Sequence, residues 1–298
     1  MIKEVIKELF ALFLIQVYYI SQKKRDDILS IYFHNPSEKV FENVLKWLVV
    51  KNYKFISTNE LYFLINGKVK QTGKLACITF DDGWSNNMML VNLLEKYKIP
   101  VTIFIPTEAI VEGNYWFEYA NVQGQKQFTG IKTKENFKKL PENIFTEKVK
   151  ILKLNYSLKR SSITLNDLKK LSENKLITIG SHSVTHPILN RCSFEKQEYE
   201  LAESKKIISN WLYKDIEYLA YPNGDFNQYT IEIAKKCGYK LGFSTELGKI
   251  DVKKVNPFII PRHVIHDTGG HYENISKALG IWQRFIKKDG HFLNPFYW

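Results

Sequence analysis

The strongest constraint on the fold is an apolar run that ends abruptly in two adjacent carboxylates. Leu75 to Phe80 is nearly all apolar, and Asp81, Asp82 and Gly83 follow it directly. The run predicts a buried strand, and the Asp-Asp-Gly sequence predicts a turn at its carboxyl end. Two neighbouring anions beside an apolar core repel each other and lose solvation, so a metal cation would stabilise them. A plain turn that caps the next helix explains the same residues.

Short apolar segments alternate with amphipathic ones along most of the chain. This order predicts an α/β fold, a distorted (β/α) barrel of about seven parallel strands joined by crossover helices. Ligand sites in such folds gather at the carboxyl ends of the strands. The predicted strands are 28–33, 53–57, 75–80, 99–105, 177–180, 218–221, 240–244 and 258–263, and a C-terminal helix is predicted at 273–288.

A pair of histidines follows another predicted strand. His182 and His186 are four residues apart and come after strand 177–180. This spacing can present two imidazoles to one ion, and with Asp82 it makes a two-histidine, one-carboxylate set with open positions. The alternative is one capping histidine and one surface histidine.

These two motifs together resemble a known family. Residues 79–83 (Thr-Phe-Asp-Asp-Gly) and 181–186 (Ser-His-Ser-Val-Thr-His) are similar to the first two motifs of the polysaccharide deacetylases, the NodB-homology enzymes of carbohydrate esterase family 4. The resemblance extends over residues 28–266. It implies a metal site made by Asp82, His182 and His186, usually for Zn²⁺, with Co²⁺ or Ni²⁺ as alternatives. Asp81 would then be the general base that activates the attacking water.

The third motif of the family departs from its pattern here. Where the family has Arg-x-Pro-aromatic-Gly, this chain has Ala-Tyr-Pro-Asn-Gly at 220–224, so the arginine that orients the base is missing. Arg262, on the last predicted strand, is the expected substitute. The backbone N–H of Asn223 is the expected oxyanion donor. Tyr221 and Pro222 of this motif, together with Trp84, are expected to contact substrate.

The general acid is the least constrained role. The C-terminal Leu-x-His motif that supplies it in most of the family has no clean copy in this sequence. A branch of the family that acts on poly-N-acetylglucosamine takes the histidine from the N-terminal side, and Phe33-His34 resembles that arrangement. His34 is therefore our first candidate, with His263 and His266 as alternates.

The resemblance implies a metal-dependent hydrolase that removes N-acetyl groups from a sugar of a cell-surface polysaccharide or glycolipid. An O-acetyl esterase and an inactive carbohydrate-binding member of the fold are the alternatives. A binding module has no need of a base, so the presence of both Asp81 and Asp82 favours an enzyme.

The net charge of the chain and the distribution of its lysines indicate which partners to expect. The chain carries a formal charge of +12, which indicates anionic surroundings. The lysines are scattered and no Arg-rich arm is present, so we expect an N-acetylated glycan or lipid-linked sugar and no nucleic acid. Residues 1–27 form an apolar helical segment that either packs on the domain or lies on a membrane surface. Residues 28–298 are the predicted catalytic domain, with an inserted excursion at about 108–160. The sequence leaves open a cytoplasmic, membrane-peripheral or secreted location.

Overall fold

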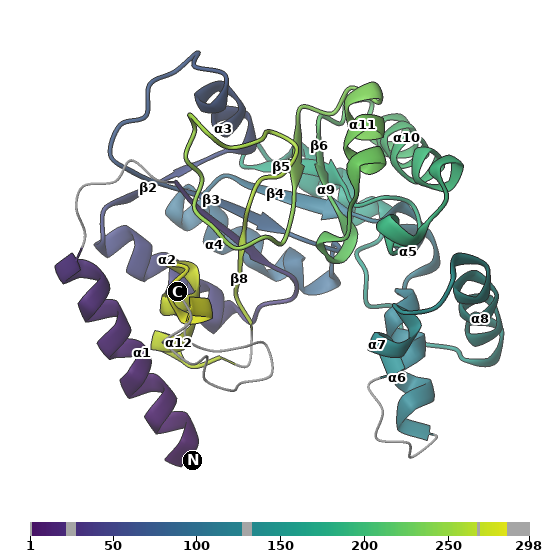
Figure 1. The fold of residues 1–298 in the computed structure, drawn as a ribbon, viewed down its shortest axis with the longest axis horizontal. Coiled ribbons are helices and arrows are strands. Elements are labelled where there is room, and N and C mark those ends of the chain that lie inside the picture. Colours follow the sequence, from purple (N-terminus) through teal and green to yellow (C-terminus); the bar gives the residue numbers. More distant parts are fainter. Residues whose placement is uncertain (1, 22–27, 127–132, 267–268, 285–298) are drawn as a thin grey trace.

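A computed structural model describes residues 2–21, 28–126, 133–266 and 269–284. Among these residues, eight parallel strands form one curved sheet with helices packed around it (Figure 1). The strands are β1 (Ile28–Phe33), β2 (Tyr53–Ile56), β3 (Lys74–Phe80), β4 (Val101–Ile105), β5 (Ile177–Ser181), β6 (Tyr218–Ala220), β7 (Leu241–Phe243) and β8 (His263–Val264). The predicted parallel (β/α) barrel is confirmed.

The strand order explains why the motifs meet. The sheet runs β7-β6-β5-β4-β3-β1-β8, and β2 pairs with the first half of β3 while β4 pairs with its second half. All residues of β1 and β4 are buried, as expected for parallel strands covered on both faces. The carboxyl ends of β1, β3, β5 and β6 therefore lie at one edge of the sheet.

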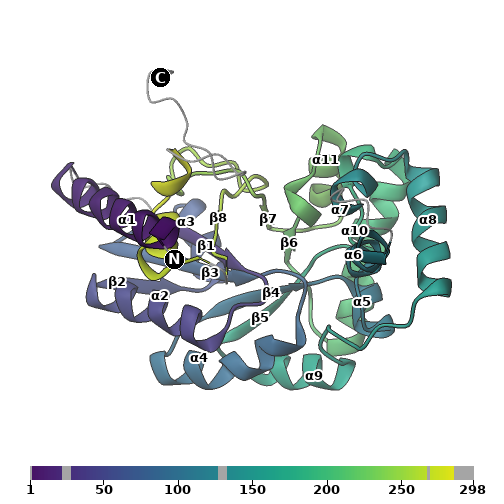
Figure 2. The same ribbon diagram turned by 90° about the horizontal axis from the view of Figure 1, so that it is seen from below.

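The helices follow the predicted alternation closely. They are α1 (Ile2–Ser21), α2 (Glu38–Val50), α3 (Thr58–Ile65), α4 (Val91–Tyr97), α5 (Thr107–Glu112), α6 (Trp116–Lys126), α7 (Thr133–Phe137), α8 (Glu142–Asn155), α9 (Leu165–Glu173), α10 (Phe194–Leu212), α11 (Gln228–Lys236) and α12 (His271–Ala278). Short 3₁₀ turns are η1 (Ser85–Leu90), η2 (Leu189–Arg191), η3 (Pro222–Gly224) and η4 (Trp282–Arg284). In Figure 2, α2, α4 and α9 cover one face of the sheet.

Two predictions for the C-terminal part need correction. The predicted strand 258–263 is mostly irregular: only His263 and Val264 pair with β1, and Ile260 makes a single bridge to Phe243. Pro261 interrupts this segment because it has no N–H to donate to a strand ladder. The predicted helix 273–288 is shorter in the structure, because α12 ends at Ala278. Residues 285–288 of that prediction, and the aromatic-rich residues 292–298 that follow, lie outside the described residues.

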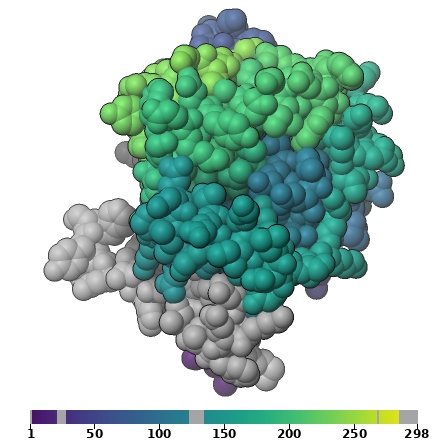
Figure 3. Space-filling view, turned by 90° about the vertical axis from the view of Figure 1, so that its right-hand side faces the viewer, coloured from purple at the N-terminus to yellow at the C-terminus, as the bar shows by residue number. Residues whose placement is uncertain are grey.

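The described residues of the segment 108–160, which are 108–126 and 133–160, form a small helical unit beside the sheet. Helices α6, α7 and α8 gather at the opposite side of the molecule from α1 and α12 (Figure 1), and their teal surface is continuous with the green α10–α11 region in Figure 3. The unit has its own apolar cluster, which includes Tyr115, Trp116, Phe117, Phe137 and Leu152. That this segment is an insertion remains a prediction.

Helix α1 is held on the domain by one face. Ala11, Leu14 and Ile15 are buried, and α1 packs against α12. The Glu8 carboxylate accepts from the backbone N–H groups of Tyr272 and Glu273, at 2.9 Å each. A carboxylate at this position satisfies free donors of the first turn of α12. No helix in the described part of the chain is long and apolar enough to cross a bilayer.

Candidate metal centre and active site

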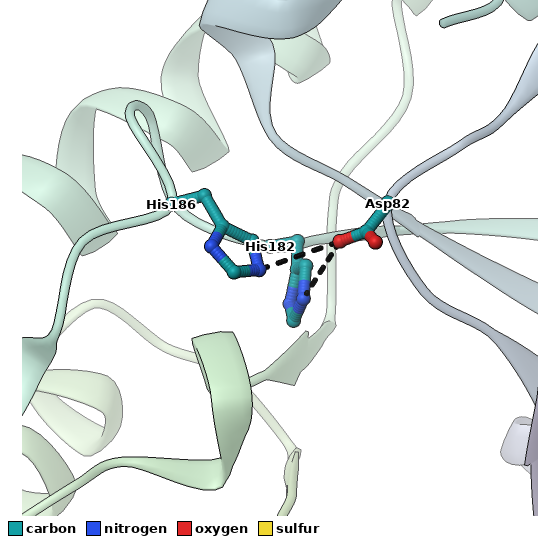
Figure 4. A group of neighbouring side chains, drawn as sticks. All are labelled: Asp82, His182 and His186. Atoms are coloured by element: carbon teal, nitrogen blue, oxygen red, sulfur yellow. Dashed lines mark ion pairs between the residues drawn. The ribbon is translucent and has the colours of Figure 1, made fainter. Parts of the chain in front are cut away.

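Three side chains from two strand ends converge on one point (Figure 4). Asp82 follows β3, and His182 and His186 follow β5; their ligand atoms all lie within 4.8 Å of one another. The Nε2 atoms of His182 and His186 are 3.5 and 3.3 Å from Asp82 Oδ1. All three residues are buried.

The protonation of His182 indicates that a cation fits this cluster. Its Nδ1 lies 2.7 Å from the carbonyl oxygen of Ala220, which can only accept, so Nδ1 carries the proton. Burial lowers the pKa of His182 to about 4, so the ring is neutral near pH 7 and its Nε2 lone pair faces Asp82. A lone pair facing a carboxylate is unfavourable without a cation between them. This arrangement, in which a carbonyl fixes the tautomer of a histidine, is typical of metal sites.

The backbone around the three residues is bent to aim them. Asp82 has φ 75°, His186 has φ 55° and Ser183 between the histidines has φ 69°. Such left-handed conformations cost free energy in non-glycine residues and cluster at functional sites. Gly83, at φ 71°, has no room for a side chain, because a Cβ there would lie 2.7 Å from Ile105 Cγ2.

Glu200 of α10 supports the histidine loop from behind. Its fully buried carboxylate accepts from the backbone N–H groups of Val184 and Thr185, at 2.8 and 2.9 Å, and from the Thr185 hydroxyl at 2.7 Å. Lys196 pairs with the same carboxylate at 2.9 Å. The loop between the two histidines is therefore fixed by a buried charge.

Asp81 is held by Arg262. The guanidinium donates from Nη1 to Asp81 Oδ1 at 2.7 Å and from Nη2 to Oδ2 at 2.8 Å. Its other donors bond Thr79 Oγ1 and the Ser244 carbonyl oxygen, at 3.0 Å each. Burial opposes ionisation of Asp81, but the Arg262 charge and hydrogen bonds, with His182, keep its pKa below the usual value. Asp81 is thus an oriented carboxylate.

Pairing of β1 with β3 brings His34 to this site. Phe33 and Phe80 are direct partners, and the Asp81 N–H donates to the Phe33 carbonyl oxygen at 2.9 Å. His34 and Asp81 are the next residues along each strand. Both line a cavity of about 850 Å³. The three candidate metal ligands and the side chains of Asn223, Trp84 and His266 line the same cavity. The Asn223 side chain adds a buried Nδ2 without a hydrogen-bond partner.

His263 and Tyr221 lie elsewhere. Neither is among the residues that line the cavity. Neighbouring residues of an extended chain point to opposite sides, so Arg262 faces the barrel interior while His263 packs against Gly280. Tyr221 is fully buried, and its hydroxyl donates to the Phe258 carbonyl oxygen at 3.0 Å. These positions are inconsistent with His263 as the acid and with Tyr221 as a substrate contact.

Of the other two expected substrate contacts, Trp84 lines the cavity and Pro222 does not. Trp84 lines the cavity and donates from Nε1 to Asp82 Oδ2 at 3.1 Å, so it supports a ligand residue as well as a cavity wall. Pro222 is buried at the start of η3 and is not among the lining residues, so its side chain shapes the turn that carries Asn223.

Sequence reasoning did not identify the aromatic contacts that the excursion makes with the site. The Tyr115 hydroxyl donates to the Asp82 carbonyl oxygen at 3.0 Å, and Trp116 Nε1 donates to the His186 carbonyl oxygen at 2.8 Å. The Phe117 ring lies 5.5 Å from the His186 ring, edge to face. The run of aromatic residues at 115–117 was the only signal for these contacts in the sequence.

The fold and the site together define a class of protein: a parallel (β/α) barrel with a two-histidine, one-carboxylate centre and an adjacent Arg-held aspartate. Residues 68–242, more than half of the chain, match the family described as Polysaccharide deacetylase. The chain belongs to the polysaccharide deacetylase family, as its motifs indicated.

Named relatives agree with this assignment. YxkH of Bacillus subtilis (strain 168), assigned by name to the polysaccharide deacetylases, is 26% identical over 71% of this chain; the match spans only 59% of YxkH. A poly-beta-1,6-N-acetyl-D-glucosamine N-deacetylase of Staphylococcus aureus (strain N315) is 27% identical over 92% of this chain and 79% of its own length. The solved Streptococcus pyogenes deacetylase PplD, in complex with acetate, shares the fold with a TM-score of 0.62 and 19% identity, covering 85% of this chain and 97% of PplD.

Proposed function

We propose that this chain removes N-acetyl groups from N-acetylated sugars of a cell-surface glycan and releases acetate. The main support is the position of Asp81, whose carboxylate is hydrogen-bonded by Arg262. It lines the same cavity as the candidate metal ligands Asp82, His182 and His186. The name of the S. aureus relative supports an N-acetylglucosamine polymer as the substrate.

The ligand set favours Zn²⁺, since two imidazoles and one carboxylate with open positions are typical of catalytic zinc sites. When bound, such an ion polarises the acetyl carbonyl and lowers the pKa of water. Asp82, His182 and His186 would hold it, with Trp84 and the Ala220 carbonyl fixing the orientation of two of them.

The remaining residues move protons and hold charge. Asp81, kept ionised by Arg262, accepts a proton from the attacking water. The backbone N–H of Asn223 and its unpartnered Nδ2 are donors for the developing oxyanion. His34 protonates the leaving amine. His266, which lines the same cavity, is the alternate donor.

The function is tested by acetate release from three substrates: β-1,6-linked N-acetylglucosamine oligomers, β-1,4-linked oligomers and O-acetylated xylo-oligosaccharides. The proposal expects release from N-acetylated substrates with appearance of free amine. Release from the xylo-oligosaccharides alone would make the protein an esterase. Stoichiometric zinc binding without release from any of the three would favour the binding-protein alternative.

We further propose that α1 rests on an anionic membrane surface. Opposite to the face that packs on α12, seven large apolar residues are between 44% and 85% exposed: Ile2, Val5, Ile6, Leu9, Phe13, Val17 and Ile20. They follow the three- and four-residue spacing of one helix face. Lys3 is exposed beside this face, which suits anionic headgroups. A glycan attached to lipid would then be presented near the cavity, because Lys7 of the same helix lines it.

A further inference from the structure

The charges that line the active-site cavity do not balance. Two of its cations are paired inside it: Arg262 with Asp81, and Lys277 with Glu273 at 2.6 Å. The remaining carboxylate, Asp82, is one of the three candidate metal ligands. Three lysines are left over: Lys7 from α1, Lys134 from α7, and Lys138 from the turn directly after α7. A divalent ion at the cluster would add further positive charge.

These three lysines lie on both sides of the candidate metal ligands. Lys7 lies on the α1–α12 side of the cavity, and Lys134 and Lys138 lie on the side of the excursion, which Figure 1 places across the sheet from α1. Lys138 has Glu135 at 3.5 Å, but that carboxylate is 53% exposed, so the pair is weak. A substrate bound across the candidate metal site would therefore have a lysine on each side.

Lys134 is the best placed of the three. Its Nζ lies 4.5 Å from the centre of the Phe117 ring, and Phe117 packs directly on the metal-ligand candidate His186. One aromatic ring therefore separates its ammonium group from the cluster. The side chain is half-buried, and no carboxylate in the described part of the chain lies within ion-pair distance of it.

An ammonium that is partly desolvated and unpaired is unfavourable until an anion meets it. Burial and the neighbouring Lys138 charge lower the pKa of Lys134, which is the electrostatic sign of that cost. The cation–π contact with the Phe117 ring compensates for this cost only in part. The remaining attraction is available to a bound anionic group.

We propose that the preferred substrate carries an anionic group, phosphate or carboxylate, within about one sugar of the N-acetyl group, and that Lys134 recognises it. This inference rests on the proposed deacetylase function. It makes Lys134 a specificity-determining residue rather than a part of the hydrolytic machinery.

The test compares matched neutral and anionic substrates. Acetate release is measured from N-acetylglucosamine and N-acetylglucosamine 1-phosphate, and from a β-1,4-linked N-acetylglucosamine hexamer and a hyaluronan hexasaccharide, in which carboxylates alternate with N-acetylglucosamine. Wild type should prefer the anionic member of at least one pair by about tenfold in kcat/KM at low salt, with the preference falling at high salt. The pair that responds tells phosphate from carboxylate.

Three variants locate the effect. Lys134→Gln should reduce the anionic-to-neutral ratio of kcat/KM about tenfold, mainly through KM, and Lys134→Arg should retain most of it. Lys139→Gln removes the same charge from an exposed neighbour outside the cavity and should keep the wild-type ratio. A Lys134→Gln variant with the wild-type ratio would overturn the inference.

Binding separates this inference from the deacetylase proposal. If wild type releases no acetate from any substrate, the proposed function fails, and calorimetric titration of the hyaluronan hexasaccharide and of N-acetylglucosamine 1-phosphate then decides. About tenfold weaker binding of either to Lys134→Gln, but not to Lys139→Gln, supports an anion-recognising lysine. Equal affinities for wild type and Lys134→Gln overturn it.

Discussion

Arg262 holds both oxygens of Asp81, although the two residues are far apart in sequence and Arg262 does not lie in the motif where the family has its arginine. The guanidinium reaches the carboxylate from the segment just before β8, which pairs with β1 next to β3. Ala220 stands where the family motif has its arginine, and in this chain the guanidinium that binds Asp81 comes from Arg262. The stability of this buried pair is the subject of the first prediction.

Removing either partner of this buried pair should destabilise the protein. Arg262→Met leaves the Asp81 charge unpaired and should lower the free energy of unfolding by about 3–5 kcal/mol. The double variant Asp81→Asn/Arg262→Met should be less destabilised than the sum of the single variants, because no buried charge is left alone. Denaturant unfolding measures this coupling. Additive effects would contradict the pairing, and Arg191→Met, at an exposed arginine that bonds a carbonyl, is the control.

Metal removal should weaken the fold around the cluster. Zinc binding to the folded state raises the melting temperature, since the ligands are brought together only there. We expect one zinc per chain in wild type, a lower melting temperature after chelation, and loss of both effects in His186→Ala. His271→Ala removes an exposed histidine outside the cavity and should behave as wild type. Unchanged zinc stoichiometry in His186→Ala would contradict the ligand assignment.

Glu200 should affect metal affinity without contacting the metal. Its carboxylate fixes the loop that carries both histidines, so Glu200→Gln, which keeps the shape but loses the charge and one acceptor, should weaken zinc binding about 10–100-fold. Competition with a chromogenic chelator measures the change. Glu203→Gln, on the outer part of the same helix, serves as the control. Equal zinc affinity in Glu200→Gln and wild type would show that the loop holds its shape unaided.

The exposed face of α1 should bind anionic vesicles. Leu9→Asp and Phe13→Asp put charges into the apolar face and should reduce flotation with phosphatidylglycerol vesicles, while Leu154→Asp, an exposed apolar position on α8, should not. Sedimentation without lipid checks the other occupant, a second copy of the chain. If all variants remain in solution as wild type does, or if the α1 variants only disrupt a dimer, membrane contact is wrong.

Local sequence patterns predicted most strands of the sheet, and the resemblance to the family gave the motif residues their expected roles. Asp81, Asp82, His182 and His186 lie directly after strands with clear apolar runs, and parallel strands bring their carboxyl ends together. His34 also directly follows a strand, but its role as the acid is implied only by the resemblance to the family. These predictions depended on position along the chain and not on side-chain contacts.

Other features depended on contacts between distant segments. The direction of His263 depends on pairing of its short strand with β1. Tyr221 is buried by contacts with Phe226, Phe243 and Phe258, which lie elsewhere in the sequence. The contacts of Tyr115 and Trp116 with the site come from a helical unit whose placement no local pattern encodes. The same holds for the position of Lys134, which lines the cavity because of where that helical unit packs.

The most direct test of the central claim is acetate release from N-acetylglucosamine oligomers by wild type and Asp81→Asn, each with zinc and after chelation. We expect wild type to release acetate only with metal, and Asp81→Asn to bind zinc yet lose at least about 100-fold in kcat, because the carboxylate that accepts the proton is gone. Full activity in Asp81→Asn, or release that persists after chelation, would contradict the account.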